Sequence, residues 1–175
     1  MTEEQQALSQ SSAIPADLSR RLSDAELQYS HTQIERALDQ LSIELTVAFQ
    51  DQTPQCICIL PEGLVFAGML MRRLVFPLTL YSWSQPPAQA VTDTLDLSRP
   101  ILLLGAEMEQ APLQPWLDWL SPGKVSCAVL LQSAEPQSCA VYAALPRLVG
   151  AKVGCGFQLD GFAANWGGLY LLDKD

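Results

Sequence analysis

Residues Cys58 to Leu78 read CILPEGLVFAGMLMRRLVFPL, two apolar segments separated by a turn. The first segment, which runs from Gln55 to Leu60, is almost continuously apolar, as expected of a strand covered on both faces. Pro61-Glu62-Gly63 is a turn signal, and the apolar segment from Gly63 to Leu74 predicts a helix. A strand, a short loop and a helix in this order predict one unit of a parallel sheet, and ligands usually bind where such strands end.

The rest of the chain repeats this alternation of strands and helices. We expect further strands at residues 78–83, 101–104, 125–131 and 169–172, a helix at 112–120 that ends at Ser121-Pro122-Gly123, and an exposed connection at 84–100. Strands that alternate with helices predict an α/β fold with a mainly parallel, twisted sheet flanked by helices.

The N-terminal third contains a strong helix signal. Ser30-His31-Thr32-Gln33 has the pattern of a capping box, and apolar residues then recur on one helical face. Those residues are Ile34, Leu38, Leu41 and Leu45. A short helix is expected from Asp17, whereas residues 1–16 are polar and predicted to be a flexible arm. The 175-residue length then favours a single domain over residues 17–175.

Composition narrows the range of functions. A net charge of −9 repels nucleic acid phosphates, so no nucleic acid partner is expected. The apolar runs are too short to span a membrane and the segment MTEEQQALSQ lacks a signal pattern, so we expect no membrane association and a cytoplasmic location. The five cysteines contain no C-x-x-C pair and are interpreted as buried thiols.

Four blocks resemble the hypoxanthine-guanine phosphoribosyltransferase family in order and spacing. They are Tyr29–Leu45, Cys58–Leu78, Arg99–Leu131 and Leu145–Leu172. The resemblance implies the type I phosphoribosyltransferase fold, with a small hood built from the chain ends. It also implies an activity of purine salvage, in which magnesium assists transfer of a phosphoribosyl group from phosphoribosyl pyrophosphate to a 6-oxopurine.

The positions that carry acidic groups in this family are largely replaced. Its adjacent acidic pair corresponds to Gly105 and Ala106, while Glu109 keeps a carboxylate at the purine-facing position. A slipped match would instead make Glu107 and Glu109 the catalytic acids. Gln158 occupies the position of the family's metal-binding aspartate. Asp160, two residues further along the chain, is a candidate metal ligand.

The ligand loops depart from the family pattern as well. The pyrophosphate loop corresponds to Leu60, Pro61, Glu62 and Gly63, the phosphate loop to Gln110, Ala111, Pro112 and Leu113, and the purine side to Ser133 and Val153. Proline removes an N–H donor, and side chains replace the glycine that would let phosphate approach closely. None of these segments contains lysine or arginine, although their ligand would be anionic.

The leading hypothesis is therefore a catalytically degenerate relative that acts as a binding or interaction protein and needs no cofactor. The alternative is a divergent purine phosphoribosyltransferase that uses magnesium. A cleft above Leu60 and Leu104 that is filled by Pro61, Glu62 and Met108 would favour the first hypothesis, and an open one the second. Partners are expected to be a second copy of the chain, through the apolar segment 69–76, or an active paralogue, through the Trp-rich stretch 116–120.

Overall fold

The computed structural model describes residues 2–9, 14–86, 95–120, 124–133 and 138–172. These residues form two compact units. The chain-end unit combines Met1–Ile34 with Val149–Asp175, and the central unit is Glu35–Leu148. Each unit is described in turn.

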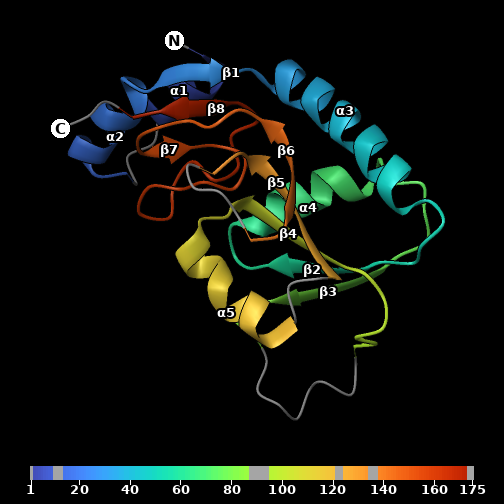
Figure 1. Cartoon of the computed structure of the whole chain (residues 1–175). Helices are drawn as coiled ribbons and strands as arrows, with labels where there is room; N and C mark the ends of the chain where they lie inside the picture. The colour runs from blue at the N-terminus through green and yellow to red at the C-terminus, as the bar shows by residue number, and fades with distance from the viewer. Residues whose placement is uncertain (1, 10–13, 87–94, 121–123, 134–137, 173–175) are drawn as a thin grey trace. The chain divides into compact units, whose positions relative to one another are not determined.

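The central unit is built on a five-stranded sheet. Its strands are β2 (Gln55–Ile59), β3 (Thr79–Trp83), β4 (Ile101–Glu107), β5 (Val125–Leu131) and β6 (Ala140–Leu145). They lie in the order β3-β2-β4-β5-β6, and every neighbouring pair is parallel (Figure 1). The α/β fold with a parallel sheet is thus confirmed. Because all five strands run the same way, their carboxyl ends share one edge of the sheet and their amino ends share the other.

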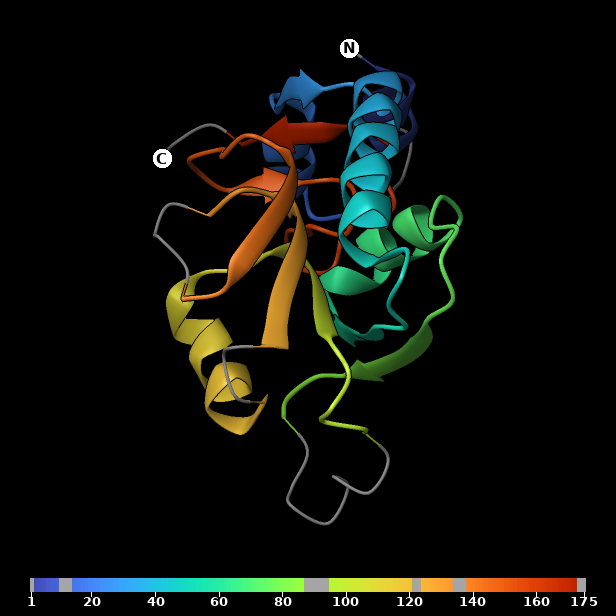
Figure 2. The ribbon, with the colours of Figure 1, turned by 45° about the vertical axis from the view of Figure 1, so that its right-hand side comes forward.

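Helices cover both faces of this sheet. Helix α4 (Gly63–Met71) and helix α5 (Gln110–Leu120) lie on opposite sides of it (Figure 2). On its inner side α5 places Trp116, Leu117 and Leu120 in a core shared with alternate residues of β2, β4 and β5. On the other side α4 buries Phe66, Ala67 and Leu70. Covered faces explain why β2, β4 and β5 are apolar over most of their length.

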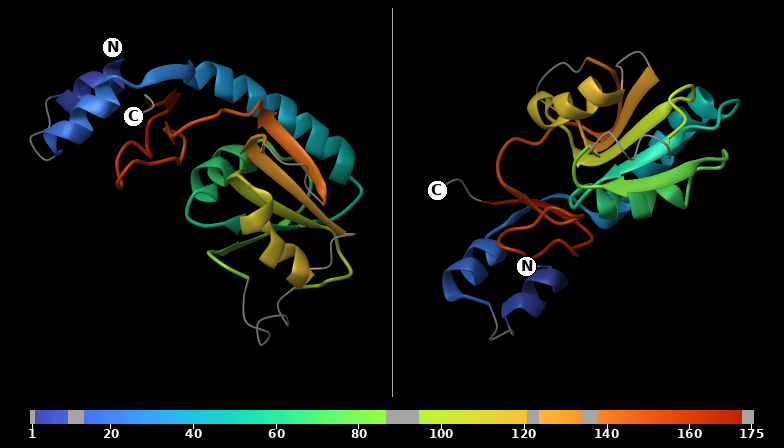
Figure 3. Two further views of the ribbon diagram at one scale, coloured as in Figure 1. Left: turned by 60° about the vertical axis from the view of Figure 1, so that its left-hand side comes forward. Right: turned by 90° about the horizontal axis from the view of Figure 1, so that it is seen from below.

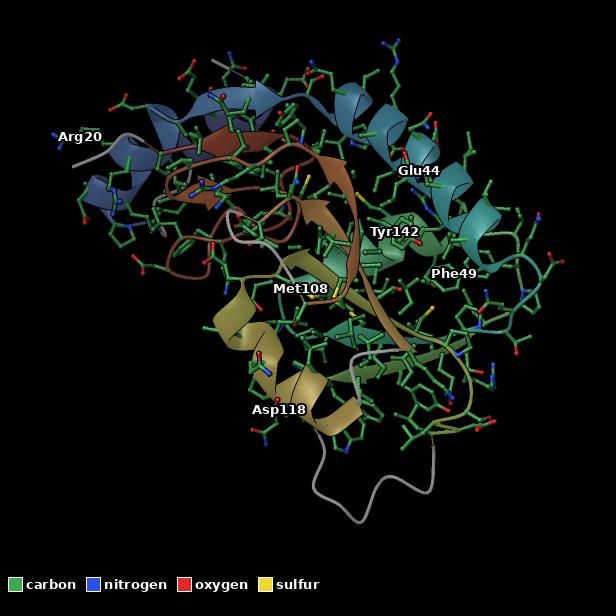
Figure 4. The ribbon with its side chains drawn as sticks, viewed as in Figure 1. Arg20, Glu44, Phe49, Met108, Asp118 and Tyr142 are labelled. Carbon is green, nitrogen blue, oxygen red and sulfur yellow. The ribbon has the colours of Figure 1, made fainter. Side chains whose placement is uncertain are left out.

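Helix α3 (His31–Phe49) begins where the capping box predicts. The Ser30 N–H donates to Gln33 Oε1 at 2.8 Å, and the Gln33 N–H donates to Ser30 Oγ at 3.4 Å, so each residue caps the other. The four predicted apolar residues are at most 1% exposed. At the far end of α3, Phe49 approaches Tyr142 of β6, with ring centroids 6.1 Å apart (Figure 4).

The chain-end unit has its own small sheet and core. It contains α1 (Glu3–Ser9), α2 (Ala16–Ser23) and three strands, β1 (Glu26–Tyr29), β7 (Lys152–Val153) and β8 (Leu169–Leu171). The strand order is β1-β8-β7 and both pairings are antiparallel. Helices α1 and α2 lie side by side (Figure 3). The two ends of the chain thus form a unit of the kind that the resemblance implies as a hood.

Within the predicted flexible arm, Glu3–Ser9 form helix α1, which is anchored to the chain-end unit. Thr2 and Gln5 form a second capping box, in which the Thr2 N–H donates to Gln5 Oε1 at 2.9 Å. The buried Gln5 amide also donates to the carbonyls of Leu22, Ser23 and Ala25. The sequence signal was present as Thr-x-x-Gln. Whether residues 17–175 behave as a single folding domain stays a prediction.

Several boundaries differ from the predicted ones. Helix α4 ends at Met71, three residues before its predicted end. Helix α5 begins two residues before its predicted start, and β4 continues past its predicted end to Glu107. Strands β1, β6 and β7 were not predicted, and β1 takes the place of the end of the helix expected from Asp17. The helix stop at residues 121–123 and residues 87–94 of the connection at 84–100 lie outside the described residues. Within the described ranges, no helix combines the length and the apolar character that crossing a membrane requires.

Candidate functional site

The loop between β2 and α4 packs directly on the end of β4. A methyl carbon added to Gly63 would lie 2.7 Å from the Leu104 carbonyl oxygen and 3.2 Å from the Gly105 Cα. Only glycine therefore fits at this position. The peptide bond between Leu60 and Pro61 is cis. The close contact places the predicted pyrophosphate loop, Leu60 to Gly63, beside the carboxyl end of β4.

Backbone N–H groups of this loop are already bonded within the protein. The Leu60 N–H donates to the Trp83 carbonyl at 2.9 Å, and the Leu64 N–H donates to the Pro61 carbonyl at 3.1 Å. Pro61 has no N–H to offer. A phosphate cradle needs several unpaired N–H groups that converge on one point, and the N–H groups of Leu60 and Leu64 are not available for one.

The side chain of Met108 occupies the space over Gly105. A methyl carbon added to Gly105 would lie 2.6 Å from Met108 Cε and 3.0 Å from Met108 Cγ. Met108 is 6% exposed and belongs to the core beneath α5. Figure 4 places it where β4 leads into α5. Pro61 and Glu62 are instead exposed, so of the three residues expected to fill a cleft only Met108 is buried.

The predicted phosphate-loop positions form the first turn of α5. The Leu113 N–H donates to the Glu109 carbonyl at 3.1 Å, and the Leu113 side chain is 1% exposed within the core. Ala111 and Pro112 are exposed. The segment that corresponds to a ligand loop in the resembled family is therefore a helix turn in this protein. Its own backbone hydrogen bond and the burial of Leu113 stabilise this turn.

Carboxylates gather in the segments that meet at this edge. Glu62 precedes α4, Glu107 ends β4 and Glu109 precedes α5; Glu62 and Glu109 are exposed and Glu107 is half-buried. Arg73, which follows the far end of α4, pairs through its guanidinium with Glu35 and with Asp39, the latter at 2.7 Å. Arg73 also donates to the Met69 carbonyl at 2.7 Å, which caps the end of α4.

The remaining predicted site residues fall in different places. Ser133 follows β5 in the central unit and is half-buried. Val153 and Asp160 belong to the chain-end unit: Val153 pairs with Tyr170 between β7 and β8 and is fully buried, whereas Asp160 is exposed and has a positive φ of 49°. In the described part of the chain, no three His, Cys, Asp or Glu side chains come together as a metal site.

A pocket at the opposite edge of the sheet was missed by sequence reasoning. This amino-edge pocket has a volume of about 640 Å³ and lies between the end of α3 and the amino ends of β5 and β6. Its lining includes Phe49, Ser98, Lys124, Ser126, Cys139 and Tyr142. These residues come from four separate segments and share no motif, so no local pattern in the sequence indicated them.

Solved structures show what this architecture is similar to. A hypoxanthine-guanine phosphoribosyltransferase from Bacillus anthracis superposes with a TM-score of 0.69 at 16% identity, over 85% of this chain and 98% of that one. A hypoxanthine phosphoribosyltransferase from Staphylococcus aureus gives 0.70 at 17% identity, over 85% and 91%. The Leishmania tarentolae enzyme in complex with GMP gives 0.70 at 16% identity, over 86% and 98%.

The chain therefore has the fold of the hypoxanthine-guanine phosphoribosyltransferases, the type I phosphoribosyltransferase fold, as the resemblance implied. No protein-family model matches the chain, and no curated protein matches it in sequence. At this level of identity the likeness speaks for the fold, and the site must be judged on its own residues.

Proposed function

We propose that this protein is a catalytically degenerate relative of the hypoxanthine-guanine phosphoribosyltransferases, which acts by binding another molecule or protein. The likeness in fold supports the relationship, and the state of the carboxyl edge supports the loss of activity. The proposal places the protein in the cytoplasm, where purine salvage substrates would be found.

The observation that carries the proposal is that the predicted phosphate-loop positions form a helix turn whose Leu113 side chain is buried. Phosphoribosyl transfer needs a cradle of N–H donors around the 5′-phosphate. Here Pro112 has no N–H, the Leu113 N–H is bonded to Glu109, and the Leu113 side chain is 1% exposed in the core. Freeing these groups would require the first turn of α5 to unfold.

Charge at this edge supports the same conclusion. A pyrophosphate group would approach Glu62, Glu107 and Glu109, whose carboxylates repel it. No lysine or arginine stands in the loops that hold these residues, and Arg73 is engaged with Glu35 and Asp39. Catalytic groups that act as a unit fail together, so the combined losses predict no turnover.

The first test is an activity assay with phosphoribosyl pyrophosphate, magnesium and hypoxanthine, guanine or xanthine. We expect no nucleoside monophosphate, with the Staphylococcus aureus enzyme as the positive control. A turnover number within about a hundredfold of the typical enzyme median of roughly 10 per second would overturn the proposal.

A binding test distinguishes the alternative, a divergent purine phosphoribosyltransferase. Phosphoribosyl pyrophosphate at ~1 mM is expected to leave the melting temperature unchanged, because a Kd above ~1 mM gives less than about 0.4 kcal/mol of stabilisation. The specific observation in favour of the alternative is that Glu107 and Glu109 stand at the end of β4, where metal-bound substrate would lie. A magnesium-dependent rise of several degrees would therefore support it.

We also propose that the protein self-associates through an apolar surface of the central unit. Ile43 and Val47 of α3 are 58% and 73% exposed, and Val75 beyond α4 is 80% exposed. Phe76, expected in this surface, is instead buried. Light scattering at micromolar concentration is expected to give the mass of a dimer, and Val75→Glu to reduce it to that of one chain. A single-chain mass for the native protein would remove this part of the proposal.

The Trp-rich stretch gives less support to an interface with an active paralogue. Trp116 is 3% exposed, and its ring packs against Trp119 with centroids 6.2 Å apart. Trp119 in turn contacts Trp83 of β3 at 5.8 Å. The aromatic rings mainly form a core between α5 and the sheet, so a paralogue would have little free aromatic surface of α5 to bind.

A further inference from the structure

Two cysteine thiols meet between β5 and β6. Cys127 lies in β5 and Cys139 directly precedes β6, and their Sγ atoms are 3.4 Å apart. Both are free thiols. They are 12 residues apart in the chain, and it is the parallel pairing of β5 with β6 that brings them together.

The two thiols differ in access. Cys127 is fully buried, whereas Cys139 is half-buried and lines the amino-edge pocket. A pocket of about 640 Å³ is within the size range of small-molecule sites. A reagent in the pocket can therefore reach Cys139, with Cys127 directly behind it.

The hydrogen bond between the two thiols shifts their pKa values in opposite directions. Donation from Cys127 to Cys139 raises the pKa of Cys127, as does its burial, and the same bond lowers the pKa of Cys139. Burial raises the pKa of Cys56 to about 12 and also raises the pKa of Cys58. Since the thiolate is the reactive form, Cys139 is expected to react before Cys127, Cys56 and Cys58.

The local geometry permits a covalent link. A disulfide needs its sulfur atoms about 2.05 Å apart, so the two Sγ atoms must approach by roughly 1.4 Å. Pairing of β5 with β6 starts at Ser126 and Ala140, which leaves Cys139 just outside the paired strands.

We propose that Cys139 and Cys127 form a thiol–disulfide exchange site that takes a low-molecular-weight disulfide from the amino-edge pocket. The Cys139 thiolate attacks one sulfur of the disulfide RSSR, whose S–S bond breaks; one RS⁻ leaves and takes up the proton that Cys139 lost. Cys127 then attacks Cys139 Sγ, the mixed disulfide breaks, and the second RS⁻ leaves with the Cys127 proton. The two protein thiols lose two electrons and RSSR is reduced to two RSH.

Peptide mapping of the intact protein tests this proposal directly. Trypsin releases Val125–Arg147 with both thiols, Ala37–Arg72 with Cys56 and Cys58, and Val153–Lys174 with Cys155. The probe is bis(2-hydroxyethyl) disulfide, which is uncharged, so its reaction does not depend on the protein's net charge of −9. Peptide 125–147 is expected to lose the mass of two hydrogen atoms and to regain it with dithiothreitol, while the other two peptides stay unmodified.

Two variants test the order of the steps. Cys127→Ser is expected to stop after the first step and retain one mixed disulfide on Cys139. Cys139→Ser is expected to react at least about tenfold more slowly than the native protein, because each pKa unit lowers the thiolate fraction tenfold. Cys58→Ser, which removes another buried thiol of the same sheet, is the matched control and is expected to react like the native protein.

Three results would overturn the proposal. The first is a mixed disulfide on Cys139 of the native protein that persists without linkage to Cys127. The second is modification of peptide 37–72 or 153–174 of the native protein before peptide 125–147. The third is a reaction rate of Cys139→Ser that equals that of the native protein. Peptide mapping of the native protein tests the proposal even if a variant does not fold.

Discussion

The two edges of the central sheet have opposite properties. At the carboxyl edge, where ligands of parallel sheets usually bind, Met108 fills the space over Gly105 and Leu113 is buried in the first turn of α5. At the amino edge a pocket of about 640 Å³ is lined by Lys124, by serines and by Cys139, whose Sγ lies 3.4 Å from that of Cys127.

This contrast separates the fold from the chemistry that it usually carries. At the carboxyl edge Gly63 packs on the end of β4, and the N–H groups of Leu60, Leu64 and Leu113 are bonded within the protein. A sheet keeps its shape through apolar packing, and that packing does not require ligand-binding groups at the strand ends. The contrast predicts that changes at the carboxyl edge mainly affect stability.

The largest expected effect is that of Leu113→Ala. Removal of a fully buried leucine side chain is expected to lower the free energy of unfolding by about 2–5 kcal/mol, measured by urea denaturation. Leu64→Ala is the matched control, because Leu64 is 60% exposed in the first turn of α4, and its effect is expected to stay below about 0.5 kcal/mol. Equal effects of the two substitutions would show that residue 113 lies in an open ligand loop.

Gly63→Ala tests the close contact between the first loop and β4. Its methyl carbon would meet the Leu104 carbonyl oxygen at 2.7 Å, so backbone must move, at a cost of about 1–3 kcal/mol of unfolding free energy. Gly68→Ala in the same helix meets no atom within 4 Å and is expected to stabilise the protein by about 0.5–1 kcal/mol. A loss of stability in Gly68→Ala as large as that in Gly63→Ala would contradict this explanation.

A double-mutant cycle tests whether Met108 fills the carboxyl edge. Gly105→Ala is expected to be destabilising beside Met108, whose Cε would lie 2.6 Å from the new methyl carbon, and to be tolerated in Met108→Ala. The coupling energy expected for residues in contact is about 0.5–3 kcal/mol, here at the lower end because a flexible side chain can move aside. Additive effects would place Met108 away from Gly105.

The smallest effect is expected at the amino edge. Lys124 is exposed and donates to the Leu97 and Ser98 carbonyls at 3.4 and 3.1 Å. Lys124→Met is expected to change the unfolding free energy by less than about 0.5 kcal/mol. A change of about 2 kcal/mol or more in the unfolding free energy, the size expected for Leu113→Ala, would remove the proposed difference between the two edges.

Elements with a complete local signal were predicted well. Strand β5 has the predicted bounds, because its uninterrupted apolar run is flanked by Gly123-Lys124 and by the polar Gln132. Helix α3 starts at its capping box. The predicted pyrophosphate loop also lies beside the carboxyl end of β4, because all parallel strands end at one edge.

Elements that depend on distant partners were not predicted. Strand β1 pairs with β8, which lies more than 140 residues further along the chain, and its four residues resemble a continuation of the preceding helix. Strand β6 contains three alanines, and Leu145 is its only buried residue, so its local strand signal is weak. Pairing across the sheet supplied the stability that these sequences lack on their own.

By itself the sequence determined the α/β class and the parallel sheet, because strand patterns and turn signals are local properties. The tertiary structure decided that Met108 and Leu113 are buried rather than facing a ligand, and that Cys127 and Cys139 meet. These facts depend on which segments pack together, and packing is set by the summed contacts of residues far apart in the chain. A local pattern cannot reveal where that packing leaves space and where it fills it.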